Sequence, residues 1–115
     1  MATKDVVDHH LAAFGAGDVD EMLRDYTGDS LLITPNATIK GLGALREAFT
    51  GFVGGLFAPG TYEFVLDAER IEGEVAFITW HATCASSDIP LGVDTFLVRD
   101  GRIAVQTYAA RMDPR

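Results

Sequence analysis

Val93-Asp-Thr-Phe-Leu-Val-Arg-Asp-Gly-Arg-Ile-Ala-Val-Gln-Thr-Tyr-Ala-Ala110 is the stretch of this chain that decides the fold. It predicts two strands joined at Asp100-Gly101, because this dipeptide accepts the positive φ angles of a tight type I′ hairpin. If Arg99 pairs with Arg102 across that turn, the pairs that follow are Val98 with Ile103, Phe96 with Val105 and Asp94 with Thr107.

This register places Asp94 on an apolar strand face, whose other members are Gly92, Phe96, Val98, Ile103, Val105 and Ala109. A carboxylate among such neighbours is costly unless it is hydrogen-bonded, protonated or exposed to a wet cavity. Asp94 is therefore the first candidate for a general acid or base with a raised pKa. The alternative is a structural carboxylate that is tied to Thr107 or to a backbone donor and does no chemistry.

Composition narrows the class of protein. With 115 residues, 48% hydrophobic and 23% charged, the chain is expected to form one globular domain over residues 1–115. Its net charge of -8 argues against nucleic acid or an anionic membrane as a partner. The single cysteine, Cys84, excludes an intrachain disulfide and is interpreted as a buried apolar residue rather than a nucleophile. We expect a cytoplasmic protein with no cofactor and no metal.

The hydrophobic period changes from that of helices to that of strands near Pro59-Gly60. Before this point we expect helices over residues 4–14, 18–26 and 43–53 and short strands over 30–34 and 37–40. After it we expect strands over residues 61–70, 74–85, 91–99 and 102–110. Their short connections imply antiparallel neighbours. Helices grouped on one side of a curved antiparallel sheet make an α+β domain.

The later strands are apolar on both faces, with Leu91, Val93 and Leu97 on one side and Phe96 and Val98 on the other. Antiparallel sheets usually leave one face in water, and the helices can cover only one face here. We therefore expect a homodimer formed through the sheet.

The order of these elements resembles the nuclear transport factor 2-like superfold, in its SnoaL-like and ketosteroid isomerase-like branch. The likeness lies in Gly17-Asp-Val-Asp-Glu-Met-Leu-Arg-Asp-Tyr26, Asp29-Ser30, Gly41 and Asp94-Thr-Phe-Leu-Val-Arg-Asp-Gly-Arg-Ile103. The resemblance implies a cone-shaped curved sheet with three N-terminal helices packed on its concave face and a cavity between them. Members of this superfold include isomerases, cyclases, hydrolases, lyases and non-catalytic binders, so the fold does not select an activity.

Ketosteroid isomerase itself uses an Asp base and an oxyanion hole made by a Tyr and a protonated Asp. By this resemblance Asp94 occupies the position of the protonated Asp, His10 lies near that of the oxyanion-hole Tyr, and Tyr26 matches a supporting Tyr. Thr34 occupies the position of the base, and a hydroxyl is no base near neutral pH without an activator. We therefore do not expect ketosteroid isomerase activity.

Two interpretations of His10 remain open. On the apolar face of the first helix it is either a packed core residue or the partner of Asp94 in a His–Asp pair that supplies a base. A turn at Ser86-Ser87-Asp88 pairs Ala85 with Ile89 and places Trp80 opposite Asp94, with His81 on the other side of the sheet. A slip of one residue in that register would exchange Trp80 and His81, so which of the two faces the pocket stays open. The residues predicted to contact a substrate are Phe14, Tyr26, Thr34, Phe52, Trp80, Phe96 and Thr107.

These features favour an apolar pocket for a small hydrophobic ligand, with Asp94 and His10 as its catalytic groups. The leading hypothesis is a cofactor-free acid–base isomerase, lyase or cyclase acting on a small hydrophobic carbonyl compound. One alternative is a non-catalytic ligand-binding protein of the same fold. Another is a homodimeric module that binds other proteins through its exposed sheet face.

Overall fold

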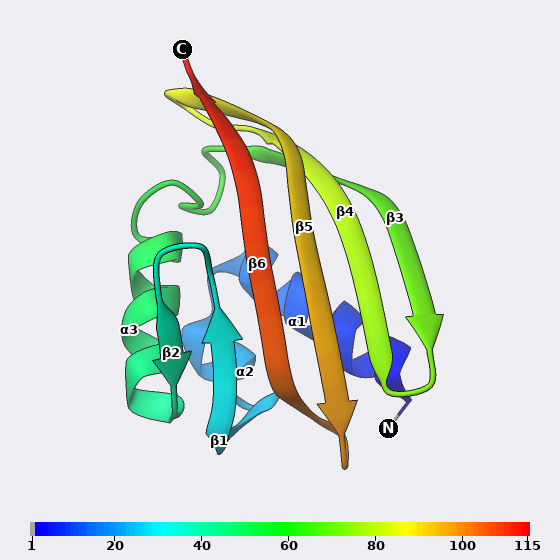
Figure 1. The fold of residues 1–115 in the computed structure, drawn as a ribbon. Coiled ribbons are helices and arrows are strands. Elements are labelled where there is room, and N and C mark those ends of the chain that lie inside the picture. Colours follow the sequence, from blue (N-terminus) through cyan, green and yellow to red (C-terminus); the bar gives the residue numbers. More distant parts are fainter. Residues whose placement is uncertain (1) are drawn as a thin grey trace.

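The structure, a computed structural model, describes residues 2–115 and combines three helices with six strands (Figure 1). In chain order these are α1 (Thr3–Ala16), α2 (Val19–Leu23), β1 (Tyr26–Ile33), β2 (Thr38–Lys40), α3 (Leu42–Val53), β3 (Glu63–Glu72), β4 (Val75–Thr83), β5 (Ser87–Arg99) and β6 (Arg102–Pro114).

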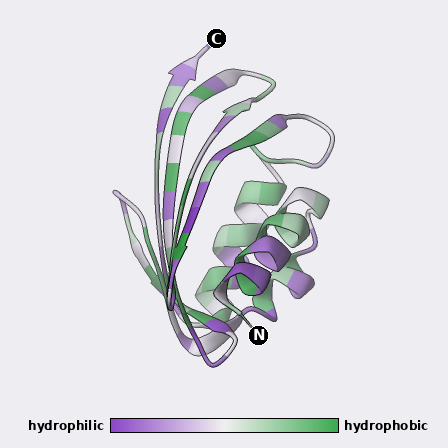
Figure 2. Ribbon diagram, turned by 90° about the vertical axis from the view of Figure 1, so that its right-hand side faces the viewer, coloured by the Kyte–Doolittle hydropathy of each residue, from purple (hydrophilic) through white to green (hydrophobic). Residues whose placement is uncertain are grey.

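The six strands form one sheet in the order β2-β1-β6-β5-β4-β3. The sheet curves, and the three helices lie on its concave side (Figure 2). The predicted α+β architecture is thereby confirmed. One pair departs from the prediction of an antiparallel sheet: β1 and β6 run parallel, whereas the other four pairs are antiparallel. The long crossover that a parallel pair requires is supplied by the whole chain between these two strands.

The closing hairpin forms as predicted at its tip. Asp100 and Gly101 have φ angles of 51° and 74°, and Val98 pairs with Ile103. Beyond that pair the predicted register is wrong, because β6 carries one extra residue, Ala104, opposite β5. Such a β-bulge reverses which side chains of a strand face which side of the sheet.

The bulge changes the neighbours of Asp94. Asp94 pairs with Tyr108 and Phe96 pairs with Gln106, not with Thr107 and Val105 as predicted. Gln106 and Tyr108 therefore share the concave side with Asp94, while the predicted neighbour Thr107 pairs with Thr95 on the convex side and is exposed.

The register of β4 also differs from the prediction, but by an even number of residues at the site. Trp80 pairs with Gly92 rather than Asp94, and Ala82 rather than Ala85 pairs with Ile89. An even shift preserves the side on which a residue lies. Trp80 accordingly faces the helices, and His81 lies on the convex side beside Asp67, as predicted.

Helix α2 is shorter than expected and ends at Leu23, so Tyr26 begins a strand instead of closing a helix. The predicted start is confirmed, because the Asp18 carboxylate accepts a hydrogen bond from the backbone N–H of Glu21 at 3.1 Å. Strands β5 and β6 each extend beyond their predicted outer ends, to Ser87 and Pro114. Cys84 is buried, as predicted.

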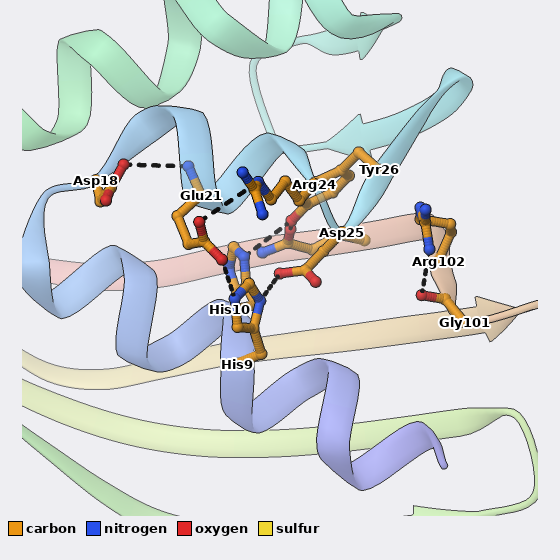
Figure 3. A network of polar contacts seen from close by, with 10 residues as sticks. His9, His10, Asp18, Glu21, Arg24, Asp25, Tyr26, Gly101 and Arg102 are labelled. Atoms are coloured by element: carbon orange, nitrogen blue, oxygen red, sulfur yellow. Dashed lines mark hydrogen bonds and ion pairs between the residues drawn. The ribbon is translucent and has the colours of Figure 1, made fainter. Parts of the chain in front are cut away.

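His9 joins α1 to α2 and to the start of β1. Its Nδ1 lies 2.7 Å from Asp25 Oδ2 and its Nε2 lies 2.8 Å from Glu21 Oε1 (Figure 3). The hydrogen bonds to Asp25 and Glu21 raise the pKa of His9. A protonated His9 thus donates from both ring nitrogens and holds the first helix against the second.

The convex face of the sheet has no covering element in residues 2–115. Val65, Val75, Phe77 and Leu91 are exposed there. No helix in this part of the chain is long and apolar enough to cross a membrane.

Candidate functional site

A pocket of about 60 Å³ lies between the concave side of the sheet and helices α1 and α3. Its walls are mainly aromatic and aliphatic, and its polar groups are few. The lining residues are His10, Leu11, Phe14, Leu32, Phe49, Phe52, Phe57, Phe64, Ile78, Trp80, Asp94, Gln106 and Tyr108. A cavity of this size holds a few water molecules or a small ligand.

Asp94 is the one carboxyl group in that lining, and it is 6% exposed. Its Oδ1 accepts a hydrogen bond from Trp80 Nε1 and its Oδ2 accepts one from Gln106 Nε2, each at 2.9 Å. Burial raises the pKa of Asp94 to about 6, although both hydrogen bonds act in the opposite direction. Such a carboxyl group exchanges a proton near neutral pH, as a general acid or base must.

Gly92 allows Trp80 to reach Asp94. The indole of Trp80 lies directly over this glycine, and a Cβ atom there would come within 2.1 Å of Trp80 Cε2. No real Cβ atom makes so close a contact, so any larger residue would displace the ring. The absent side chain of Gly92 is therefore what lets the Trp80 N–H point at the carboxylate.

Gln106 links Asp94 to two further buried polar residues. While its Nε2 donates to Asp94, its Oε1 accepts a hydrogen bond from the Tyr26 hydroxyl. The same hydroxyl lies 3.3 Å from His10 Nδ1. Asp94, Gln106, Tyr26 and His10 thus form one hydrogen-bonded chain, which crosses from β5 through β6 and β1 to α1.

His10 is buried among the rings of Phe14, Phe49 and Phe96. Burial, assisted by the neighbouring His9, lowers the pKa of His10 to about 4, so the ring is neutral at pH 7. Of the two interpretations left open for His10, the packed core residue is confirmed, and the direct His–Asp pair is not formed. The partner of His10 in residues 2–115 is Tyr26, and its connection to Asp94 passes through two side chains.

The other predicted contact residues line the pocket, lie buried outside its lining, or do not reach it. Phe14, Phe52 and Trp80 line the pocket. Tyr26 and Phe96 are buried outside its lining, and Tyr26 acts through Gln106 and His10.

Thr34 and Thr107 do not reach the pocket. The Thr34 hydroxyl accepts hydrogen bonds from the backbone N–H groups of Asn36 and Ala37 in the turn after β1, where the side chain is used to close the turn. Thr107 is turned outward by the bulge in β6. On β1 the pocket wall is Leu32, which has no acid–base group either.

Gln106 and Tyr108 are the polar residues that sequence reasoning missed. Both lie in the quoted hairpin, but the regular alternation of a strand places them on the outer face. Only a bulge brings them to the pocket, and no glycine or other residue typical of a bulge marks Ala104 in the sequence. Residues 2–115 hold no group of three or more His, Cys, Asp or Glu side chains suited to a metal ion.

Comparisons with known proteins agree with this fold. The sequence model of the SnoaL-like domain family matches residues 7–106 of this chain. The epoxide hydrolase/cyclase-like enzyme SalBIII, described with a role in pyran ring formation in the polyether salinomycin, has a TM-score of 0.83 and 16% identity, and the match covers 98% of this chain and 95% of that one.

Two further solved structures are similar. An LEH-like epoxide hydrolase of M. tuberculosis has a TM-score of 0.76 and 15% identity over 95% of this chain and 82% of its own. An NTF2-like protein of unknown function from Cytophaga hutchinsonii has a TM-score of 0.78 and 11% identity over 96% of this chain and 91% of its own. At these identities the likeness shows the fold alone. No curated protein sequence matches the chain.

Replacing Gly92 by alanine tests the close contact with Trp80. We expect Gly92→Ala to destabilise the protein by about 1–3 kcal/mol, because the indole must move. We also expect it to raise the pKa of Asp94, because the Trp80 hydrogen bond that favours the carboxylate is lost. Urea unfolding and a carbon-detected NMR titration of Asp94 measure the two effects. The matched control is Gly43→Ala in α3, where a Cβ atom meets nothing within 4 Å and stability should stay the same or rise. Equal behaviour of the two variants would contradict the contact.

The raised pKa of Asp94 predicts how stability depends on pH. Folded Asp94 keeps its proton up to about pH 6, whereas the unfolded chain loses it near the ordinary value of 3.8. The folded state therefore binds more protons between these values, and its stability falls as pH rises through them. From pH 4.5 to pH 8 we expect the free energy of unfolding of the wild-type protein to fall by about 2 kcal/mol more than that of Asp94→Asn. Other groups titrate in both proteins, so the difference between their urea-unfolding curves isolates Asp94; parallel curves would show an ordinary pKa.

Proposed function

The chain belongs to the family of SnoaL-like domains, and from this premise we propose that it is a cofactor-free acid–base enzyme acting on a small hydrophobic carbonyl compound. The observation that carries the proposal is Asp94: a carboxyl group buried in an aromatic pocket, held by two donors and with a pKa of about 6. Many isomerase, lyase and cyclase reactions of carbonyl compounds use the proton transfer that such a group performs.

In the proposed reaction, the Asp94 carboxylate removes a proton from the carbon next to the carbonyl group. The electron pair of that C–H bond forms an enolate, and the proton stays on the Asp94 carboxyl group. The same carboxyl group then returns the proton at another atom of the substrate, which leaves the enzyme unchanged. The aromatic walls hold the apolar body of the substrate and exclude water, which would otherwise compete for the proton.

Some of the similar folds support this class of chemistry, because SalBIII is described as epoxide hydrolase/cyclase-like and another is an epoxide hydrolase. Ketosteroid isomerase activity is not part of the proposal. Thr34 lies in a turn, and the pocket wall of β1 offers only Leu32.

A second candidate is a non-catalytic binding protein. It is favoured by the small volume of the pocket and by the two hydrogen bonds that already occupy the Asp94 oxygens. Hydrophobic ligands would then raise the melting temperature equally in the wild-type protein and in Asp94→Asn, with no proton transfer.

Proton exchange in D2O separates the two candidates. We expect the wild-type protein to accelerate loss of the α-protons of small ketones, such as cyclohexanone and acetophenone, as followed by NMR. We expect Asp94→Asn to lose about 100-fold or more of this rate, because the base is gone. The control is Asp67→Asn on the convex side, which should keep the full rate. Ketones that stabilise both proteins but exchange in neither would establish the binder.

We also propose that the convex face joins two copies of the chain, because Val65, Val75, Phe77 and Leu91 are exposed together there. Light scattering should then give twice the chain mass of 12.4 kDa. Phe77→Glu should yield monomers, since it buries a charge in the interface. Leu42→Glu, at an exposed apolar residue of α3, should leave the dimer intact. A monomeric wild-type protein would contradict the proposal.

A further inference from the structure

We propose that Gln106 and Tyr26 connect the protonation state of Asp94 to the tautomer of His10. Through this connection, His10 Nε2 presents a lone pair to the pocket while Asp94 is ionised, and an N–H group when Asp94 carries a proton. The two polar ends of the pocket therefore change together.

The direction of the hydrogen bonds is set at Trp80. An indole nitrogen can only donate, so Asp94 Oδ1 always accepts from Trp80 Nε1. A proton held by Asp94 within this chain must then lie on Oδ2, which faces Gln106. Only two arrangements of the chain satisfy every donor and acceptor.

The first arrangement has the amide orientation of Gln106 found in the structure, and it requires Asp94 to be ionised. Gln106 Nε2 donates to Asp94, and Gln106 Oε1 accepts from Tyr26. A phenol has one hydrogen, so the Tyr26 oxygen can only accept from His10. The proton of the neutral His10 ring is therefore on Nδ1, 3.3 Å from that oxygen, and Nε2 carries the lone pair.

We infer that His10 Nε2 is the polar atom that His10 offers to the pocket. It has no hydrogen-bond partner in residues 2–115, and His10 lines the pocket. In residues 2–115, Glu69 Oε2 is the fully buried polar side-chain atom that lacks a hydrogen-bond partner. His10 Nε2 also lacks a partner but is not in that class, so it is not fully buried. The lone pair is thus available to a ligand.

The second arrangement follows when Asp94 gains a proton on Oδ2. That proton donates to Gln106 Oε1, so the amide turns and its Nε2 donates to Tyr26. The Tyr26 hydroxyl then donates to His10 Nδ1. The ring gives up its proton at Nδ1 and takes one at Nε2 through water in the pocket, so the net uptake is the single proton on Asp94.

In residues 2–115 one further carboxyl group, that of Asp25, acts on a member of this chain: it helps to raise the pKa of Tyr26, and it is itself hydrogen-bonded to His9. The titratable neighbours of Asp94 are the phenols of Tyr26 and Tyr108. The titratable neighbours of His10 are Tyr26 and His9. Toward the pocket, α3 contributes Phe49 and Phe52, and β3 contributes Phe64. Because its pKa is held near 4, His10 stays neutral while Asp94 titrates, and its tautomer is the property that changes.

The tautomer change selects the ligand, a step that rests on the proposed function. With Asp94 ionised, His10 accepts a hydrogen bond, which favours a small aromatic compound that carries a phenol or enol hydroxyl. When Asp94 takes a proton from the substrate, His10 becomes a donor to the enolate oxygen that forms. The pocket thereby gains a stabilising N–H group at the step that creates negative charge.

Nitrogen NMR of the His10 ring tests the connection without any turnover. At pH 8 we expect the Nδ1–H tautomer in the wild-type protein. In Asp94→Asn the amide oxygen must face Trp80 and the amide N–H group must face Gln106, which predicts the Nε2–H tautomer. His81, which pairs with Asp67 on the convex side, is the control and should not change. The same tautomer of His10 in both proteins would overturn the proposal.

Two further measurements test the connection if Asp94→Asn does not fold. In the wild-type protein alone, the His10 tautomer should change with the same midpoint as the carbon-detected titration of Asp94; separate midpoints would overturn the connection. In Tyr26→Phe, which keeps the ring but removes the hydroxyl, the tautomer should no longer follow Asp94. A tautomer that still follows Asp94 there would likewise overturn it.

Binding of phenol and of its methyl ether, anisole, tests the ligand class through the fluorescence of Trp80, the only tryptophan. At pH 8 the wild-type protein should prefer phenol by about tenfold, and Asp94→Asn should lose or reverse that preference. A preference for anisole in the wild-type protein would overturn the ligand class. The NMR measurements need no substrate. If the His10 tautomer follows Asp94 but the protein does not accelerate proton exchange of ketones, the proposed function is wrong and the connection between Asp94 and His10 stands.

Discussion

The rest of the pocket depends on one constraint: a carboxyl group buried in an apolar cavity needs donors on both of its oxygens. Asp94 obtains one from Trp80 and one from Gln106. These residues belong to β4 and β6, the strands on either side of β5. The carboxyl group therefore joins three strands through side chains as well as through their backbones. Each donor also depends on a local irregularity of the sheet.

Those two irregularities are a missing side chain and an additional residue. Gly92 provides the space in which the indole of Trp80 lies flat against β5. The bulge at Ala104 turns Gln106 inward. With a larger residue at the first position or a regular strand at the second, Asp94 would lose a donor and its pKa would rise further. The same bulge also brings Tyr108 into the wall of the pocket.

His9 and His10 show how strongly tertiary environment determines the chemistry of a residue type. They are adjacent on α1, and their side chains point about 100° apart around the helix. His9 lies between the carboxylates of Asp25 and Glu21, which raise its pKa. His10 lies among aromatic rings with one hydroxyl partner, and burial lowers its pKa. The first histidine holds two helices together in its charged form, and the second can serve the pocket only in its neutral form.

By itself, the sequence determined the element order, the α+β architecture, the type of the closing turn and the place of Asp94 and Trp80 on the inner side. Each of these follows from local preference or from the alternation of neighbouring residues, as at Asp100-Gly101 and along β4. Only the tertiary structure decided the partners of Asp94, the outward position of Thr107 and the indirect link to His10. A bulge at an alanine has no local signal, and one additional residue reverses every side chain beyond it. The hydrogen-bonded chain joins residues up to 80 positions apart, as between Tyr26 and Gln106, so it exists only once the strands have assembled.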